Sequence, residues 1–348
     1  MKYFKIINSV KGNNKWKYSI GVHDLKTKGE KFDTTLSCGP GGLYFTKLKY
    51  IFEFLEYGDM LCEIIVLGQK VKVNNIKYKT DRLEIISMHP LNDLTTWKFM
   101  IENGCPRDIN ICIWAAKHNN FEILKWAHDD GYIWNKDICH YATKNNNIEM
   151  LKWARENKYP WDELVCYWAA NYNNFEMLKW AYDRLCPCNK YVFYWASKHN
   201  NLEMLKYVYK HESQLDEFVC LNAVMNNNLE MLKWARENNC QWHKDIYLCA
   251  TKNNNLEMLK WIHESGCLIP FTKRYFWASR NNNFEMIKWI YETYESLHDD
   301  GDICYYAASN NNLEMLKWAF DKGFTCNKGS VKYWAIEHKN FEMLRLES

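Results

Sequence analysis

The chain has 348 residues, of which 47% are hydrophobic, and its formal net charge is +3. The length suits two or three domains or one elongated array, and the near-neutral charge favours no particular class of partner. No run of eighteen apolar residues occurs, and residues 1–15 lack the apolar segment of a secretory signal. We therefore predict neither a membrane span nor secretion.

The fourteen cysteines bear on the redox compartment of the protein. Because no secretory signal is present, we expect reduced core thiols in an intracellular protein, with disulfides as the alternative. No CxxC pair and no His/Cys quartet has the spacing of a zinc site. We therefore predict no bound metal and no cofactor.

Residues 1–92 predict a small α+β module in which apolar and polar residues alternate. The expected elements are strands at 63–68 and 70–73, a strand or connector at 78–86, and a short helix at 46–55. The stretch 38–45 is typical of a turn, and its GPGG lacks the spacing of a phosphate-binding loop. The module carries 15 basic and 9 acidic side chains, a net charge of +6, whereas the remaining residues have a net charge of −3.

A ten-residue motif, NNNIEMLKWA at 145–154, recurs along the rest of the chain. We number each copy from its first apolar residue, position 0, which returns after 27 to 29 residues in nine copies. These residues are Phe121, Ile148, Phe175, Leu202, Leu229, Leu256, Phe284, Leu313 and Phe341. A near-constant period of this length indicates stacked repeats, so we predict a solenoid over residues 93–348 that begins with a half copy at Leu94.

Each repeat predicts two helices. In the second helix, the apolar positions 0, +2, +3, +5 and +6 spread over roughly 220°, well beyond the ~100° stripe of a surface helix. We therefore expect contacts with neighbouring repeats on several sides, with the tryptophans at position +5 in the core. In the first helix, position −6 is alanine in all nine copies, which indicates a close helix crossing.

The asparagines between the two helices predict a turn. Asparagine tolerates the left-handed conformation that ends many helices, and it is also a favoured N-cap. His118, His199 and His338 occupy the same turn in other copies, and we interpret them as turn residues rather than catalytic bases. The alternative is an asparagine ladder that binds a ligand.

The repeat resembles the ankyrin repeat in its helix, asparagine-rich turn, second helix and exit loop, as in DICHYATKNNNIEMLKWARENKYPW at 137–161. It resembles in particular the divergent ankyrin repeats of giant DNA viruses such as mimiviruses, which carry the same N-N-N-L-E-M-L-K-W-A signature. The period is shorter than the family's usual period of about 33 residues, so we expect helix pairs without long β-hairpin fingers. The PGGLYF and EYGDMLCEI stretches resemble a module that precedes the repeats in some giant-virus proteins.

Position −8 of the first helix predicts a partner-binding surface. It should lie opposite the buried face of that helix, yet it is mostly apolar or aromatic, and a basic residue follows four positions later in five copies. Such rows suit partner binding. The candidate binding residues are Tyr167, Tyr194, Phe276, Tyr305, Tyr333, Lys144, Lys198 and Lys252. The alternative is that these side chains pack between adjacent first helices.

The resemblance implies a non-enzymatic scaffold for protein–protein interactions in the host cytoplasm, with an unidentified protein of host origin as its partner. No Ser/His/Asp, Cys/His or paired-carboxylate arrangement predicts catalysis. One alternative is nucleic-acid binding through the basic module or the aromatic and basic row, which the acidic solenoid disfavours. Another is an enzyme within residues 1–92 that finds its substrate through the repeats. The sequence indicates no oligomeric state.

Overall fold

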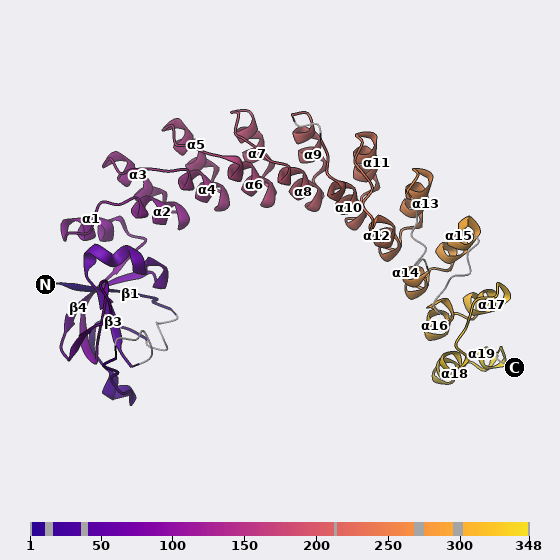
Figure 1. Cartoon of the computed structure of the whole chain (residues 1–348), viewed down its shortest axis with the longest axis horizontal. Coiled ribbons are helices and arrows are strands. Elements are labelled where there is room, and N and C mark those ends of the chain that lie inside the picture. Colours follow the sequence, from indigo (N-terminus) through magenta and orange to yellow (C-terminus); the bar gives the residue numbers. More distant parts are fainter. Residues whose placement is uncertain are drawn as a thin grey trace. The chain divides into compact units, whose positions relative to one another are not determined.

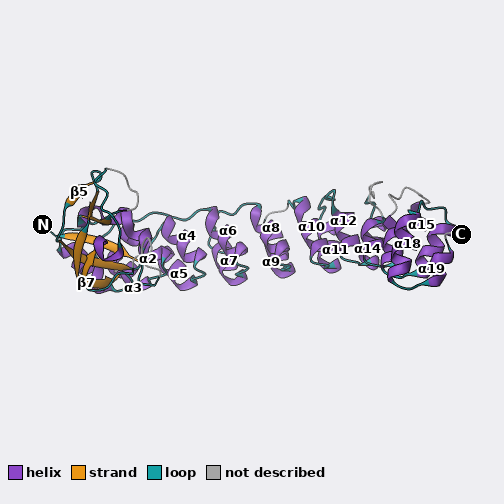
Figure 2. Cartoon of the chain, turned by 90° about the horizontal axis from the view of Figure 1, so that it is seen from below, coloured by secondary structure: helices purple, strands orange, loops and turns teal. Residues whose placement is uncertain are grey.

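The computed structural model describes residues 2–10, 17–35, 41–211, 214–267, 275–294 and 302–346. The chain divides into two compact units, Met1–Val165 and Cys166–Ser348. Among the described residues, strands occur only before Leu91 and α-helices only from Leu94 onward (Figure 1). Figure 2 shows the same division between strands and helices by colour. The fold is therefore mainly α, with a small α+β module before an ankyrin-like solenoid, as predicted; the domain boundary at 92/93 stays a prediction.

The first unit begins with a seven-stranded sheet in the order β2-β7-β4-β1-β3-β6-β5. Every pair of neighbouring strands is antiparallel. The strands are β1 Tyr3–Ile7, β2 Gly21–Asp24, β3 Leu43–Thr46, β4 Met60–Val66, β5 Lys70–Lys72, β6 Lys77–Thr80 and β7 Arg82–Pro90. Two 3-10 helices, η1 Leu25–Lys28 and η2 Leu48–Tyr57, follow β2 and β3.

The predicted elements of this module are found with shifted limits. The expected strands at 63–68 and 70–73 are β4 and β5, and the expected helix at 46–55 is η2. The segment 78–86 belongs to two strands, because Asp81 breaks it and accepts a hydrogen bond from the Gln69 N–H at 2.7 Å. Strands β1, β2 and β3 were not predicted. Of the expected turn at 38–45, residues 38–40 lie outside the described residues, and residues 43–45 belong to β3.

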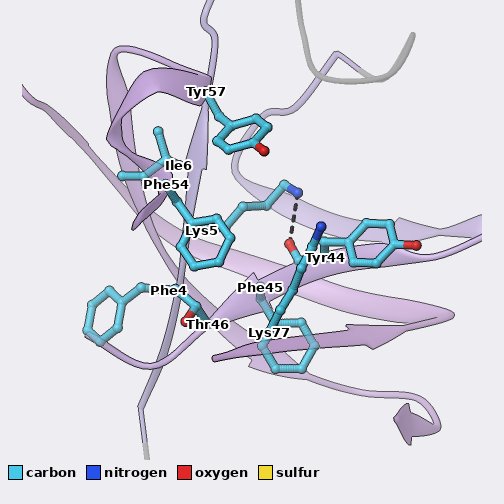
Figure 3. A pocket seen from close by; sticks show the side chains of 9 residues that line it. All are labelled: Phe4, Lys5, Ile6, Tyr44, Phe45, Thr46, Phe54, Tyr57 and Lys77. Atoms are coloured by element: carbon cyan, nitrogen blue, oxygen red, sulfur yellow. Dashed lines mark hydrogen bonds between the residues drawn. The ribbon is translucent and has the colours of Figure 1, made fainter. Parts of the chain in front are cut away.

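Strand β1 lies inside the sheet but pairs unequally with its two neighbours. Five of its residues pair with β4, whereas only Phe4 pairs with β3, opposite Thr46. The two strands separate beyond this pair, and the Lys5 side chain reaches across the opening to the Tyr44 carbonyl (Figure 3). The opening therefore interrupts the hydrogen bonding of an otherwise continuous sheet.

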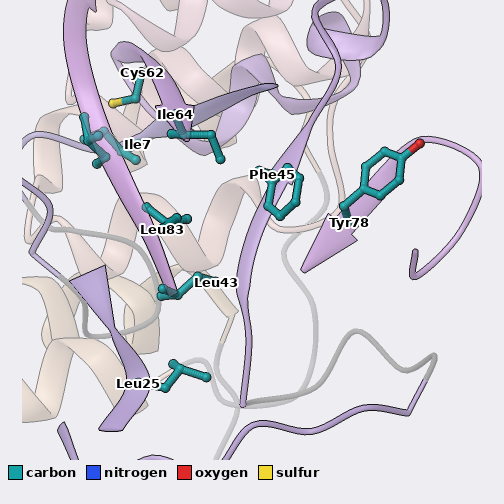
Figure 4. Packing of buried hydrophobic residues seen from close by; sticks show 9 residues of the cluster. Ile7, Leu25, Leu43, Phe45, Cys62, Ile64, Tyr78 and Leu83 are labelled. Carbon is teal, nitrogen blue, oxygen red and sulfur yellow. The ribbon is translucent and has the colours of Figure 1, made fainter. Parts of the chain in front are cut away.

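One face of the sheet carries the core of the module. Alternate residues of five strands point into it, because successive side chains of a strand face opposite ways. With Leu25 of η1, they are Ile7, Leu43, Phe45, Cys62, Ile64, Tyr78, Leu83 and Ile85 (Figure 4). On the other face, Phe4 packs edge-on against Phe99, with ring centroids 6.5 Å apart. Since Phe99 belongs to the first α-helix, this contact joins the sheet to the helices of the same unit.

Nine helix pairs follow α1 Leu94–Glu102 in the described residues. Those of the first unit are α2 Asn110–Lys117 with α3 Phe121–Asp129 and α4 Asp137–Lys144 with α5 Ile148–Glu156, and α6 Glu163–Asn171 crosses the division between the units. Those of the second unit are α7 Phe175–Tyr182, α8 Tyr191–Lys198, α9 Leu202–Tyr209, α10 Glu217–Met225, α11 Leu229–Glu237, α12 Ile246–Lys252, α13 Leu256–Glu264, α14 Phe276–Arg280, α15 Phe284–Tyr294, α16 Asp302–Ser309, α17 Leu313–Asp321, α18 Lys328–Glu337 and α19 Phe341–Arg345. The described residues of the repeats contain no strand.

The repeats share one pattern of burial. In the copy around α5, Met150, Leu151 and Ala154 are fully buried, as is Ala142 at position −6 of α4. Burying one leucine or methionine side chain stabilises the fold by about 1.5–3 kcal/mol, so these columns supply much of the stability of each pair. The tryptophans at position +5 are half-buried rather than fully inside the core, because they pack between repeats, as Trp153 does against Phe121 at a centroid distance of 5.4 Å.

The three consecutive asparagines between α4 and α5 each have a different role. Asn147 caps α5 by accepting a hydrogen bond from the Met150 N–H at 2.9 Å. Asn146 adopts the left-handed conformation, with a φ of 56°, which asparagine tolerates better than most residues. Asn145 donates to the Ala116 carbonyl of the preceding repeat at 2.7 Å. The predicted turn is confirmed.

The asparagines also join adjacent repeats. The amide of Asn147 donates to the side-chain oxygen of Asn119 at 2.8 Å. The same bond recurs in the second unit between Asn201 and Asn173, Asn228 and Asn200, Asn255 and Asn227, Asn283 and Asn254, Asn312 and Asn282, and Asn340 and Asn311. Each capping asparagine thus uses its oxygen within its own repeat and its amide toward the preceding one. This asparagine ladder serves the stacking of repeats, unlike the ligand-binding ladder considered from the sequence.

Candidate partner-binding surface

The candidate surface is formed by the first helices of the second unit. These helices, from α8 to α18 by even numbers, line one side of the unit, and the second helices line the other (Figure 1). Tyr167 lies on the part of α6 that belongs to the same unit. At position −8, Tyr305 and Tyr333 are 42% and 57% exposed. Tyr167, Tyr194 and Phe276 are half-buried, whereas Lys144, Lys198 and Lys252 are exposed. Lys144 belongs to α4 of the first unit, whereas the five aromatic candidates belong to the second unit.

The aromatic candidates contact one another's helices through edge-to-face pairs. The rings of Tyr167 and Trp195 lie 6.0 Å apart, and those of Tyr305 and Trp334 lie 6.2 Å apart. In both cases position −8 of one first helix meets position −7 of the next. The rings therefore pack between adjacent first helices, which was the alternative reading, and they also keep part of their surface in solvent.

Basic side chains lie over these rings. The Lys198 ammonium is 4.7 Å from the centroid of Trp195 and 5.3 Å from that of Tyr194. Lys252 lies 5.4 Å from Trp277 of the next repeat. A cation over an aromatic ring is attracted by the electron density on the face of the ring, an effect worth about 0.5–1 kcal/mol at an exposed site. The structure thus brings Tyr194 and Lys198 together around a tryptophan that the sequence analysis did not select.

Several surface residues were missed from the sequence. Position −7 holds an aromatic residue in seven of nine copies, including Trp195, Trp277, Tyr306 and Trp334. The same side of the second unit also exposes Tyr191, Phe218 and Met225, by 53%, 40% and 58%. The recurrence of aromatic residues at position −7 was visible in the sequence and could have extended the predicted row to a double row.

The histidines of the turns have structural partners. Nε2 of His199 lies 2.6 Å from the Asn171 carbonyl oxygen, and Nε2 of His338 lies 2.9 Å from that of Ser309. These bonds reach back to the preceding repeat, as the bond of Asn145 does. His118, His199 and His338 each directly follow the last residue of a first helix, so their position in the turn is as predicted.

In α4, the cysteine Cys139 directly precedes His140 in the chain. Burial raises the pKa of the Cys139 thiol to about 12, so the thiol next to His140 is neutral at pH 7 and a poor nucleophile. No three His, Cys, Asp or Glu side chains among the described residues are grouped as metal ligands. None of the described helices combines the length and apolar character needed to cross a membrane.

The cysteines differ in part from the expectation of reduced thiols. Cys166 is joined to Cys188, and Cys304 to Cys326, with Cα atoms 5.5 and 5.4 Å apart. Each pair links position −9 of a first helix to position +13 after the second helix of the same repeat. Seven further cysteines in the described residues, among them Cys62 and Cys139, are free thiols. The pairing was missed because the partners are 22 residues apart and meet only once the repeat has folded.

Comparisons with known proteins agree with this architecture. Residues 112–155 match the family model of ankyrin repeats in many copies. An uncharacterized protein of Acanthamoeba polyphaga mimivirus is 34% identical over 137 residues, which cover 38% of this chain and 91% of that protein. Two putative ankyrin repeat proteins of the same virus are 28% and 30% identical over 130 and 111 residues. These matches cover 35% and 29% of this chain, and 64% and 33% of the two relatives.

Proposed function

The chain belongs to the divergent ankyrin-repeat proteins of mimivirus-like giant viruses, and we propose that it is a scaffold that binds a host protein along its first helices. Ankyrin repeats generally mediate protein–protein interactions. The observation that carries the proposal is the double row of partly exposed aromatic rings with basic side chains over them, represented by Tyr194, Trp195 and Lys198. The host origin of the partner is proposed from the viral relatives.

The chemistry of the double row supports this choice of surface. Tyrosine, tryptophan and arginine dominate the energetics of protein interfaces because they offer large contact areas. The rings of Tyr194 and Tyr305 are held by neighbouring aromatic side chains, so little conformational entropy is lost when a partner covers them. The second helices instead expose a charged stripe, such as Glu149 and Lys152 with their charged atoms 3.7 Å apart, which a protein interface would have to desolvate.

The test is site-directed photocrosslinking in the full-length chain. A benzophenone amino acid would replace Tyr194 or Tyr305, and in the control it would replace Lys233 of the second helix α11. In nuclease-treated host-cell lysate, we expect one discrete protein adduct from both first-helix positions and none from Lys233. The double variant Tyr194→Ser with Tyr305→Ser should remain folded and lose capture of the same protein. Equal adducts from all three positions, or unchanged capture by the folded variant, would overturn the proposal.

Nucleic-acid binding is a second candidate, favoured by one cluster of lysines in the sheet module. Lys47, Lys49 and Lys72 surround Tyr50, and a hydrogen bond with Lys49, followed by the charges of the three lysines, lowers the pKa of the tyrosine. None of the three forms an ion pair within the described part of the chain. Phosphate contacts would give an affinity that falls steeply with salt.

This candidate is tested with a fluorescent single-stranded oligonucleotide. We expect binding that weakens with a linear logarithmic dependence on salt, and that loses about one unit of slope for each lysine replaced by glutamine. Lys233→Gln on α11 is the matched control and should leave the slope unchanged. Binding that is absent at low salt, or a slope that does not respond to Lys47→Gln, would remove this candidate.

A further inference from the structure

The opening between β1 and β3 forms a cavity of about 100 Å³. It is lined by residues of β1, β3, β6 and η2, because the two strands separate after their single pair at Phe4 and Thr46. Figure 3 shows aromatic side chains around it, with Phe54 and Tyr57 contributed by η2. This space is smaller than the apolar cavity of about 150 Å³ that accommodates benzene in another protein, but it is open on one side, so a small ring would lie partly inside it.

A buried ammonium group reaches into this cavity. Lys5 is 7% exposed, and its Nζ donates to the Tyr44 carbonyl at 2.8 Å (Figure 3). The same nitrogen lies 4.7 Å from the centroid of the Tyr18 ring. A lysine ammonium has three donors, and the carbonyl satisfies one of them. Burial lowers the pKa of Lys5 to about 8, with Cys62 opposing and Lys77 adding to the shift, so the group is still mainly charged at neutral pH.

No carboxylate compensates this charge in the described residues. Among the ion pairs found there, Lys5 has none, and residues 11–16 and 36–40 contain no aspartate or glutamate. The other buried lysine of the module differs: Lys79 forms an ion pair with Asp33 at 3.2 Å. A buried charge without a counter-ion is costly, so the Lys5 site favours an anion from outside the chain.

A second lysine, Lys77, lines the same cavity. Lys77 of β6 lies with its Nζ 4.3 Å from the centroid of Tyr44, and it also forms no ion pair within the described residues. The remaining walls are mainly apolar, including Phe4, Ile6 and Phe54. Two ammonium groups beside an apolar space specify a ligand with one anionic end and one compact hydrophobic end.

We propose that this cavity binds a small carboxylic acid with a flat, ring-sized apolar body. Its carboxylate accepts hydrogen bonds from Lys5 and Lys77, and its body lies against Phe54 and Tyr57. The site is independent of the partner-binding surface on the first helices, so either proposal can fail without the other.

The test uses the full chain with 4-fluorobenzoate, followed by fluorine NMR of the ligand and by methyl NMR of labelled isoleucines. The Ile6 methyl signals should shift, whereas those of Ile290 in α15 should not. The neutral isostere 4-fluorobenzamide and inorganic phosphate separate the contributions of charge and ring. We expect each to bind about tenfold or more weakly than the benzoate, as expected for a lost charged hydrogen bond or a lost apolar contact.

Variants complete the test. Lys5→Met keeps most of the aliphatic length and should weaken benzoate binding about tenfold or more, and Lys77→Met should also weaken it. Lys26→Met in η1, an exposed lysine of the same module, is the matched control and should bind like the unaltered chain. If Lys5→Met fails to fold, Lys77→Met and the two comparison ligands still decide the question. Benzamide or phosphate binding as well as benzoate, or no shift at Ile6, would overturn the proposal.

Discussion

The repeats and the sheet module bury their side chains in different ways. In the repeats, one residue type performs the same task in copy after copy, as the capping asparagines Asn147 and Asn228 do. In the sheet, single residues have tasks with no counterpart elsewhere, such as Gly58 and Lys5. Repeat arrays are stabilised by contacts within repeats and between nearest neighbours, whereas a sheet depends on pairings across long stretches of chain. Substitutions that separate local from distributed contacts can test this difference.

The largest expected effect is in the repeat core. Leu232 of α11 is fully buried, so Leu232→Ala should lower the free energy of unfolding by about 2–5 kcal/mol through lost burial and a residual cavity. Lys233→Ala, its neighbour on the charged stripe, should change it by less than about 0.5 kcal/mol. Urea unfolding followed by circular dichroism measures both. A loss below about 1 kcal/mol for Leu232→Ala would mean that neighbouring repeats close the cavity.

In the sheet module, adding a side chain at Gly58 should lower the free energy of unfolding. A Cβ added to Gly58 would clash with the Ile7 carbonyl oxygen, which is main chain and must move. We expect Gly58→Ala to cost at least about 1–3 kcal/mol, through overpacking that disturbs the pairing of β1 with β4. Gly329→Ala in α18 is the matched change in a repeat, where only the Asn327 side chain comes near. It should leave stability unchanged or slightly raised, because alanine favours a helix.

The asparagine ladder predicts an intermediate effect. Asn228→Ala removes the cap on the Met231 N–H and the bond to Asn200, and it should cost about 1–2 kcal/mol. Asn227→Gly is the control, because glycine accepts the φ of 55° and loses only the bond from Asn255. Its cost should be smaller in the same urea experiment. Equal costs would show that the ladder, rather than the cap, holds the turn.

The smallest expected effect is the loss of stability with rising pH, for which one thiol in each region can be compared. Burial raises the pKa of both Cys62 in β4 and Cys139 in α4 from 9.0 to about 12, and the Lys5 charge partly opposes the shift at Cys62. The native state therefore holds these protons more tightly than the unfolded chain. The associated stability is complete below pH 9 and is lost between about pH 9 and 12.

Each thiol should account for about 1 kcal/mol of lost stability between pH 8 and pH 10. Urea unfolding in the presence of a reductant measures this loss, and Cys139→Ala should make it smaller by that amount. Cys249 in α12 is only partly buried, so Cys249→Ala is the matched change with less influence. An identical pH dependence of the unaltered chain and Cys139→Ala would contradict the raised pKa.

The repeats could be predicted from the sequence more fully than the sheet module, because their residues recur and those of the sheet do not. Each column of the repeat is sampled nine times, so the left-handed turn at Asn146 and the close crossing at Ala142 could be read directly. Strand β1 occurs once, and its incomplete pairing with β3 involves residues such as Lys5 and Tyr44, 39 positions apart. No local pattern reports a pairing of that kind, so the sheet order and its cavity could not be predicted.

The candidate surface was predicted only in part for a related reason. Position −8 stood out because an aromatic residue there is unexpected on a solvent-facing helix. Its partner at position −7, such as Trp195 against Tyr167, became evident only when two adjacent first helices were placed together. The disulfide between Cys166 and Cys188 likewise depends on the path of the exit loop rather than on the helical period.

The asparagine ladder has a consequence for the history of the gene. Every repeat from Asn201 to Asn340 presents the same donor to the copy before it, and nearly every one offers the same acceptor to the copy after it. A copy duplicated or deleted by recombination within the coding sequence therefore finds matching neighbours at both of its ends. The same hydrogen bond forms between any two adjacent repeats, whatever their place in the array. The number of repeats can therefore change while each junction keeps this bond.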